Sequence, residues 1–179
     1  MSWTMNTMKI KMKSTKAAEA AFEAVTNYLK KNASNYETLN ADQLMADLSV
    51  KGKAIVFEDS YAMHGCDFLT LIPEICKEIA ASSSINAFSG EAFYGSGYGD
   101  EGNFEIRYEN GTLYLKSVVY PNGYCEYLCC EECGTDAILF DEYEEGKIYI
   151  CPECGEEIDL SEAYEECKPE IKEIVLNTK

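Results

Sequence analysis

The chain has 179 residues, of which 46% are hydrophobic, so it can form one domain with a small appendage and is not a disordered protein. No apolar run approaches the roughly 18 residues that cross a bilayer. The N-terminus also lacks the apolar stretch of a secretory signal, and we therefore expect a cytoplasmic protein. In a reducing compartment, nine cysteines favour metal ligands and buried thiols over a disulfide framework.

The formal net charge of −17 is distributed unevenly along the chain. Residues 1–53 hold eight lysines and five acidic residues, whereas residues 54–179 hold 27 acidic residues and seven basic ones. Seventeen of these acids lie within residues 126–173, beside three lysines. Because nucleic-acid binding depends on Lys and Arg, this charge argues against direct contact with DNA or RNA. The acids either keep the surface soluble or attract a basic partner protein.

The N-terminal part of the chain alternates between strand and helix patterns. Polar and apolar residues alternate strictly over Met8–Lys13, which predicts a half-buried strand. Ser14 and Thr15 then offer an N-cap, and apolar residues recur at helical spacing as far as Lys31. A second, short helix is expected over Ala41–Leu48, with Asn40 as its cap.

The next predicted elements are a buried strand at Ala54–Phe57 and a helix over Phe68–Ala81, with Pro73 in its first turn. From residue 85 the pattern changes to strands, expected at Ile85–Tyr94, Asn103–Glu109 and Thr112–Tyr120. Asn110-Gly111 is a strong hairpin signal between the last two of these strands.

These elements predict an α+β body over residues 1–122, with an antiparallel sheet and helices on one sheet face. Their order resembles that of ferredoxin-like domains found in small plasmid and phage proteins. Pro121-Asn122-Gly123 marks the boundary, and residues 123–179 are expected to form an acidic ribbon with a C-terminal helical tail that starts near Ser161. Within the ribbon, strands at Ala137–Phe140 and Lys147–Ile150 are expected to pair with each other.

Two cysteine pairs dominate the ribbon, in Cys130-Glu-Glu-Cys133-Gly134 and Cys151-Pro-Glu-Cys154-Gly155. Each Cys-x-x-Cys turn offers two thiolates, and the glycine after it tolerates a left-handed turn. The spacing between the pairs lets Cys130, Cys133, Cys151 and Cys154 bind one tetrahedral metal ion. Four thiolates leave no open position, so the metal is expected to have a structural role.

The two turns resemble the knuckles of zinc ribbons and of rubredoxin, over about 26 of the 179 residues. Zinc is the expected ion, and the likeness to rubredoxin implies iron and electron transfer as the alternative. Cys129 could replace Cys130 as a ligand through a shift of one residue. Cys125 and Cys167 flank the site, as spare thiols or as neighbours of the ligands.

Other motifs do not make an active site. His64 and Cys66 could act as base and nucleophile, but no oxyanion loop accompanies them. The glycine-rich segment 95–102 lacks the Lys-Ser/Thr of a phosphate-binding loop and is read as a hairpin connection. Glu58 and Asp59 are read as a solvated strand end. We therefore expect a protein that is not an enzyme.

In size, charge and the absence of catalytic motifs, the chain resembles small acidic phage inhibitors of the anti-CRISPR type. This resemblance implies a DNA-mimicking surface that docks on a basic, nucleic-acid-handling protein such as a Cas nuclease, in the cytosol of the host cell. No membrane or direct nucleic-acid contact is expected. The predicted partner contacts are Glu131, Glu132, Asp141, Glu142, Glu144 and Glu145. A rubredoxin-like iron protein is the alternative function.

Overall fold

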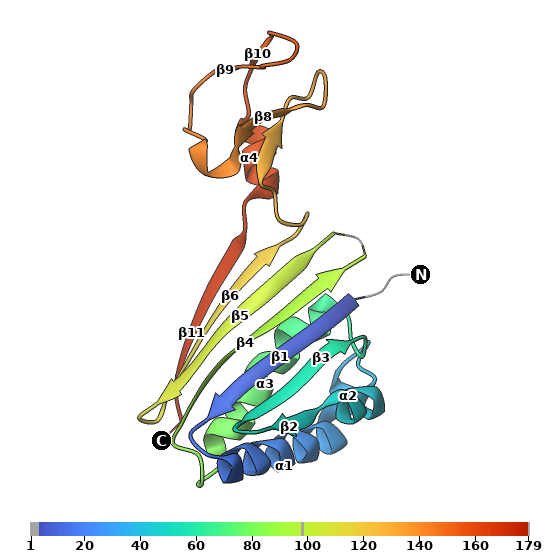
Figure 1. The fold of residues 1–179 in the computed structure, drawn as a ribbon, viewed down its shortest axis with the longest axis vertical. Coiled ribbons are helices and arrows are strands. Elements are labelled where there is room, and N and C mark those ends of the chain that lie inside the picture. The colour runs from blue at the N-terminus through green and yellow to red at the C-terminus, as the bar shows by residue number, and fades with distance from the viewer. Residues whose placement is uncertain (1–3, 98, 179) are drawn as a thin grey trace.

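The computed structural model describes residues 4–97 and 99–178, which form an α+β fold around one large antiparallel sheet. Its seven strands run in the order β11-β6-β5-β4-β1-β3-β2 (Figure 1). Their bounds are β1 (Thr4–Met12), β2 (Ser49–Lys51), β3 (Ala54–Ser60), β4 (Ala87–Ser96), β5 (Glu101–Glu109), β6 (Thr112–Tyr120) and β11 (Glu170–Asn177).

Three helices cover one face of this sheet, which lies in front of them in Figure 1. They are α1 (Thr15–Asn32), which continues into the short 3-10 helix η1 (Ala33–Asn35), α2 (Ala41–Asp47) and α3 (Gly65–Ala81). The main core lies between the sheet and the helices. Alternation along β1 points Met8 and Ile10 into this core and leaves Lys9 and Lys11 exposed on the opposite, open face.

Local sequence signals place several of these elements as expected. The Ser14 hydroxyl accepts a 3.1 Å hydrogen bond from the backbone N–H of Ala17 and caps α1. The Asn40 side chain caps α2 in the same way, through the N–H of Gln43 at 3.1 Å. Asn110-Gly111 forms the predicted hairpin turn, with both residues at positive φ.

Helix α3 differs from the prediction because it begins at Gly65, almost one turn early. Pro73 is the ninth of its 17 residues and lies in the middle of the helix. Even a start at Phe68 would place Pro73 beyond the first turn, so the prediction of a position where the missing N–H costs nothing was wrong. Proline cannot donate the backbone hydrogen bond of this position. Burial of the apolar face of α3 compensates for the missing bond, since Phe68, Leu71 and Ile72 are completely buried against the sheet.

The end of the chain is the largest departure from the predicted fold. The expected helical tail stops at Cys167, and Glu170–Asn177 forms strand β11, paired antiparallel with β6 along its whole length. Ile171, Ile174 and Val175 have the i, i+3, i+4 spacing of a helix, so periodicity does not identify this segment as a strand. The outer edge of β6 offers backbone N–H and C=O groups that need partners, and residues 170–177 supply them by pairing as a strand. Residues 121–169 are thus an insertion between two neighbouring strands.

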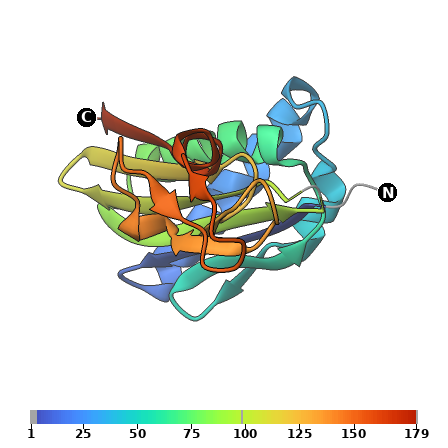
Figure 2. The same cartoon turned by 90° about the horizontal axis from the view of Figure 1, so that it is seen from above.

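This insertion, called the ribbon module below, extends from one end of the sheet (Figure 1) and lies in front of it when the molecule is seen from above (Figure 2). Its elements are β7 (Tyr127–Cys129), β8 (Asp136–Leu139), the 3-10 helix η2 (Phe140–Glu142), β9 (Tyr149–Ile150), β10 (Glu157–Ile158) and α4 (Ser161–Cys167). The predicted pairing of Ala137–Phe140 with Lys147–Ile150 is wrong. Instead, β7 pairs with β8 and β9 with β10. Each Cys-x-x-Cys turn is itself the loop of a hairpin, which keeps each pairing local.

We predict that Gly90→Ala destabilises the body by about 1–3 kcal/mol, the usual cost of overpacking. A Cβ at this position of β4 would collide with the carbonyl oxygen of Lys9 and lie 2.8 Å from the Cα of Ile10. Urea unfolding of the metal-loaded protein measures the change. Ser89→Ala, one residue earlier on the exposed face of the same strand, is the control and should be neutral. Equal stability of the two variants would contradict the prediction.

Candidate metal centre

The first cysteine turn joins β7 to β8 and is closed by two backbone hydrogen bonds. The N–H of Gly134 donates to the carbonyl of Cys130 at 2.7 Å, and the N–H of Cys130 donates to the carbonyl of Thr135 at 2.9 Å. Gly134 has φ +72°, a conformation that glycine adopts without steric cost. The chain can therefore turn back after the second cysteine, with both sulfurs on the inside of the turn.

The second turn joins β9 to β10 and repeats this geometry. The N–H of Gly155 donates to the carbonyl of Cys151 at 3.0 Å, and the N–H of Cys151 donates to the carbonyl of Glu156 at 2.9 Å. Gly155 has φ +76°, close to the value at Gly134. The ribbon module thus holds two equivalent knuckles, as the matched sequence motifs predicted.

The four sulfurs of Cys130, Cys133, Cys151 and Cys154 lie within 4.8 Å of one another. Sγ of Cys130 is 3.8 Å from Sγ of Cys154, and Sγ of Cys133 is 3.6 Å from Sγ of Cys151. A tetrahedral zinc ion with Zn–S bonds of about 2.3 Å requires S–S distances of about 3.8 Å. The four thiols could therefore hold one metal ion with little rearrangement.

Backbone N–H groups give the thiols of the second knuckle different acidities. The N–H groups of Cys154 and Glu153 favour the Cys151 thiolate and lower its pKa to about 6. The N–H of Glu156 also favours the Cys154 thiolate, but the hydrogen bond with Cys151, desolvation and the hydrogen bonds with Cys130 and Cys133 together outweigh it and raise the pKa of Cys154 to about 12. A metal ion that binds all four sulfurs must therefore displace protons.

A small apolar cluster supports the two knuckles. Cys130 and Cys151 are buried in it with three aliphatic side chains, Leu128, Ile158 and Leu160. Tyr164 of α4 stacks on Phe140 and on Tyr143, with ring centroids 4.8 and 4.3 Å apart. Two short hairpins and one short helix bury too little apolar surface to be stable alone, so a metal ion would supply much of the folding free energy.

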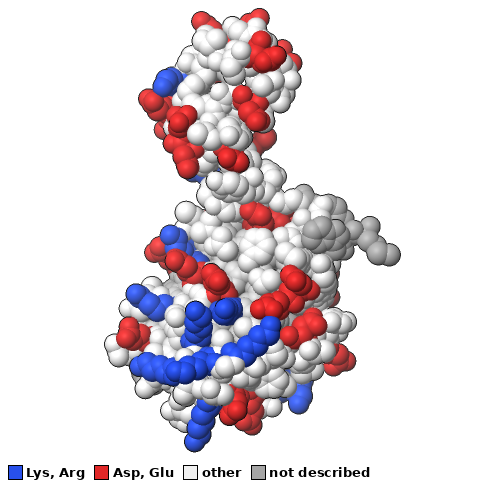
Figure 3. Space-filling view, in the orientation of Figure 1, with Lys and Arg blue, Asp and Glu red and all other residues white. Residues whose placement is uncertain are grey.

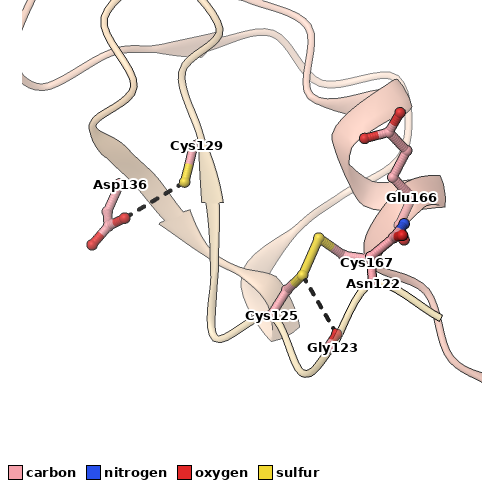
Figure 4. The surroundings of a disulfide bond; sticks show 7 residues. All are labelled: Asn122, Gly123, Cys125, Cys129, Asp136, Glu166 and Cys167. Atoms are coloured by element: carbon pink, nitrogen blue, oxygen red, sulfur yellow. Dashed lines mark hydrogen bonds between the residues drawn. A yellow bond between two sulfur atoms is a disulfide. The ribbon is translucent and has the colours of Figure 1, made fainter. Parts of the chain in front are cut away.

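The remaining cysteines of the ribbon module are placed differently from expectation. Cys129 is exposed, and its thiol faces Asp136, with Sγ 3.6 Å from Oδ1, so it does not replace Cys130 in the cluster. Cys125 and Cys167 form a disulfide with Cα atoms 5.7 Å apart (Figure 4). The expectation that these two cysteines are spare thiols or neighbours of the ligands was therefore wrong. The two residues are 42 positions apart, and no local pattern relates them.

All six predicted partner contacts are exposed on the ribbon module. Glu131 and Glu132 lie inside the first knuckle, Asp141 and Glu142 on η2, and the other two, Glu144 and Glu145, in the turn after it. Figure 3 shows acidic side chains in several patches on the visible surface of this module, with few basic ones. Of the six, Glu144 makes an ion pair, with Lys147 at 2.9 Å.

The other candidate residues lie in the body and form no common site. The backbone N–H of His64 donates to Oγ1 of Thr38 at 3.0 Å, at the start of α3. Cys66 is exposed in the first turn of that helix. The side chain of Glu58 makes an ion pair with Lys51 at 2.7 Å. The glycine-rich segment joins β4 to β5, and the Ser96 hydroxyl donates to the Asp100 carboxylate.

Sequence reasoning missed a shallow hollow of about 700 Å³ on the open face of the sheet. Lys9, Lys11, Arg107 and Lys116 line it, together with three carboxylates and the ring of Tyr114. The Arg107 guanidinium lies over this ring, 4.8 Å from its centroid. Basic side chains gather on this face in Figure 3, at the end of the molecule away from the ribbon module.

Searches against protein-family models, curated proteins and solved structures each returned no match. None of the helices in residues 4–97 and 99–178 is long and apolar enough to cross a membrane.

We predict that Cys130→Ser abolishes tight metal binding and unfolds the ribbon module, whereas the body stays folded because its core is separate. Metal analysis of the purified protein measures binding, and amide hydrogen exchange resolved by region measures folding. Cys66→Ser, outside the module, is the matched control and should keep one metal ion per chain. Loss of protection in both regions at once would contradict independent folding.

We also predict that acid releases the metal. Protons compete with the metal for the four sulfurs, so affinity falls as the pH falls and is retained at neutral and higher pH. A pH titration of the cobalt-substituted protein, followed by its visible thiolate absorption, measures the release. A spectrum that stays constant down to pH 4 would contradict thiolate coordination.

Proposed function

We propose that this protein is a non-catalytic zinc protein whose acidic ribbon module docks on the basic surface of a nucleic-acid-handling protein. In its most specific form, the proposal is that the protein is an inhibitor of the anti-CRISPR type, which blocks nucleic-acid loading of a Cas nuclease in the host cytosol. The observation that carries the proposal is the concentration of unpaired carboxylates on a unit built around four cysteine sulfurs.

The charge on this unit has almost no internal compensation. Residues 126–168 contain fifteen acidic residues, all exposed, and two lysines. Both lysines are already paired, Lys147 with Glu144 and Lys168 with Glu165. Thirteen carboxylates therefore have no ion pair within the described residues. Their mutual repulsion would be relieved by a cationic partner, which would also be steered toward them over long range.

Apolar side chains on the same unit favour a protein as the partner over a cation that binds through charge alone. Ile148 and Ile150 are 55% and 60% exposed. They flank Tyr149, which is half-buried next to Tyr143, so alternation along the strand points both isoleucines outward. Exposed aliphatic anchors surrounded by carboxylates suit a surface of arginines and lysines with apolar stems.

A rigid array of carboxylates can occupy a channel that normally binds phosphates. In nucleases guided by RNA, such a channel holds the nucleic-acid backbone through Lys and Arg. The metal would keep the spacing of the carboxylates fixed, so that less conformational entropy is lost on docking. The body would then serve as the scaffold that presents the ribbon module.

The order of the first four strands supports a ferredoxin-like assignment of the body. Strands β4, β1, β3 and β2 are adjacent in this order, and each pair is antiparallel. Helices α1 and α2 follow β1, and α3 follows β3, which gives the split β-α-β arrangement. On this assignment β5, β6 and β11 extend the sheet on one side and carry the ribbon module.

A rubredoxin-like electron carrier is the second candidate, because four thiolates bind iron in the same geometry as zinc. The two candidates differ in colour: an iron tetrathiolate absorbs visible light and zinc does not. Metal analysis and the absorption spectrum of protein purified from its native host decide between them. Iron with a reversible redox couple would favour electron transfer over docking.

We predict that reversing the six predicted contacts to lysine lowers partner capture from host lysate by at least tenfold. Affinity capture at low and high salt, with mass spectrometry of the bound proteins, measures it. The matched control reverses six exposed acids of the body, Glu19, Glu23, Glu37, Glu78, Glu105 and Glu109, and thus changes the net charge equally. Capture that is insensitive to salt, or lost equally in both variants, would contradict docking through the ribbon module.

A further inference from the structure

The ribbon module is joined to the body by two passages of chain, and the disulfide ties these passages together. One passage leaves β6 and contains Cys125, and the other leaves α4 at Cys167 and leads into β11. A hydrogen bond also links them, from the Asn122 side chain to the carbonyl of Glu166 at 2.9 Å. Figures 1 and 4 show this neck between the sheet and the knuckles.

The position of this crosslink relates it to the metal site. All four candidate ligands lie between Cys125 and Cys167 along the chain, so the disulfide brackets the complete knuckle pair. Both bridging cysteines are half-buried and within reach of solvent. Six of the seven cysteines of this region thus form two separate sets, one bonded sulfur to sulfur and one converging on a common centre. The seventh, Cys129, belongs to neither set.

We propose that Cys125–Cys167 is a reversible thiol–disulfide site that sets the metal affinity of the ribbon module. This inference rests on metal binding at the four cysteines, which is part of the proposed function, and does not depend on the docking partner. The oxidised form binds the metal tightly, and the reduced form binds it more weakly. In a reducing cytosol, a disulfide that persists only part of the time suits a redox-sensing role.

The coupling follows from the conformational freedom of the metal-free module. Pairing of β6 with β11 already holds the ends of the insertion together, from Val119 opposite Glu170 onward. The disulfide closes a second, short ring, which runs from that residue pair to the Cys125–Cys167 bond. This ring reduces the number of conformations that the metal-free chain can adopt. Closing such a ring lowers the entropy of the unfolded form, and we expect metal affinity to change on the order of tenfold to a hundredfold.

The reaction is an ordinary thiol–disulfide exchange with a dithiol reductant. A thiolate of the dithiol attacks one sulfur of the bridge, the Cys125–Cys167 bond breaks, and a mixed disulfide forms. The second thiol of the reductant then displaces the protein sulfur. The protein gains two electrons and two protons as two thiols, and the reductant leaves as its own disulfide.

The direct test compares full-length oxidised protein with the Cys125→Ser/Cys167→Ser variant. Zinc affinity is measured by competition with a chromophoric chelator, and the visible spectrum of the cobalt form reports on the four thiolates. We expect the variant to keep one metal ion per chain and the tetrathiolate spectrum, with affinity lower by at least tenfold. Cys66→Ser is the control and should match the unmodified protein.

Affinities of the oxidised protein and the double variant that agree within twofold would overturn the proposal. If the variant loads no metal, unmodified protein reduced with a phosphine, which competes weakly for zinc, provides the second measurement. Weaker binding that recovers on reoxidation supports the proposal, and unchanged affinity overturns it. None of these measurements includes the docking partner, so a failure of docking in the lysate experiment leaves their outcome intact.

Discussion

Pairing between β6 and β11 is the contact on which the arrangement of the whole chain depends. It returns the C-terminal segment to the sheet and fixes both ends of the ribbon module. Without this pairing, the ribbon module would be attached to the body only through the passage of chain that follows β6. With it, the module that carries the four cysteines, the neck disulfide and the acidic surface is attached to one end of the sheet through two passages of chain. The fold therefore converts a short, weakly stable insertion into a positioned structural unit.

Charge and metal chemistry act together in this unit. A dense array of carboxylates opposes compaction, since like charges repel, and the small apolar cluster around Leu128 and Ile158 offers little to offset that repulsion. Metal–thiolate bonds would supply the missing free energy. The same carboxylates attract cations. The charge that weakens the isolated module would therefore also attract a basic partner.

The opposite end of the molecule has another character. The open sheet face presents Lys9, Lys11, Arg107 and Lys116 around a shallow hollow, together with three carboxylates, whereas residues 126–168 of the ribbon module hold fifteen acidic residues and two lysines. This polarity was visible in the sequence only as a charge difference between the N-terminal and C-terminal parts. The sheet turned it into a spatial difference, because alternation along β1, β5 and β6 directs these cations to one face.

The sequence by itself determined the features that depend on neighbouring residues: the caps at Ser14 and Asn40, the hairpin at Asn110, and the cysteine knuckles with their left-handed glycines. Tertiary structure decided what depends on distant residues. Glu170–Asn177 became a strand because β6 offered an open edge, and Cys125 met Cys167 because that strand brought the two passages of the neck together. Spacing and periodicity report on a few residues at a time, and contacts across tens of residues leave no such trace in a single sequence.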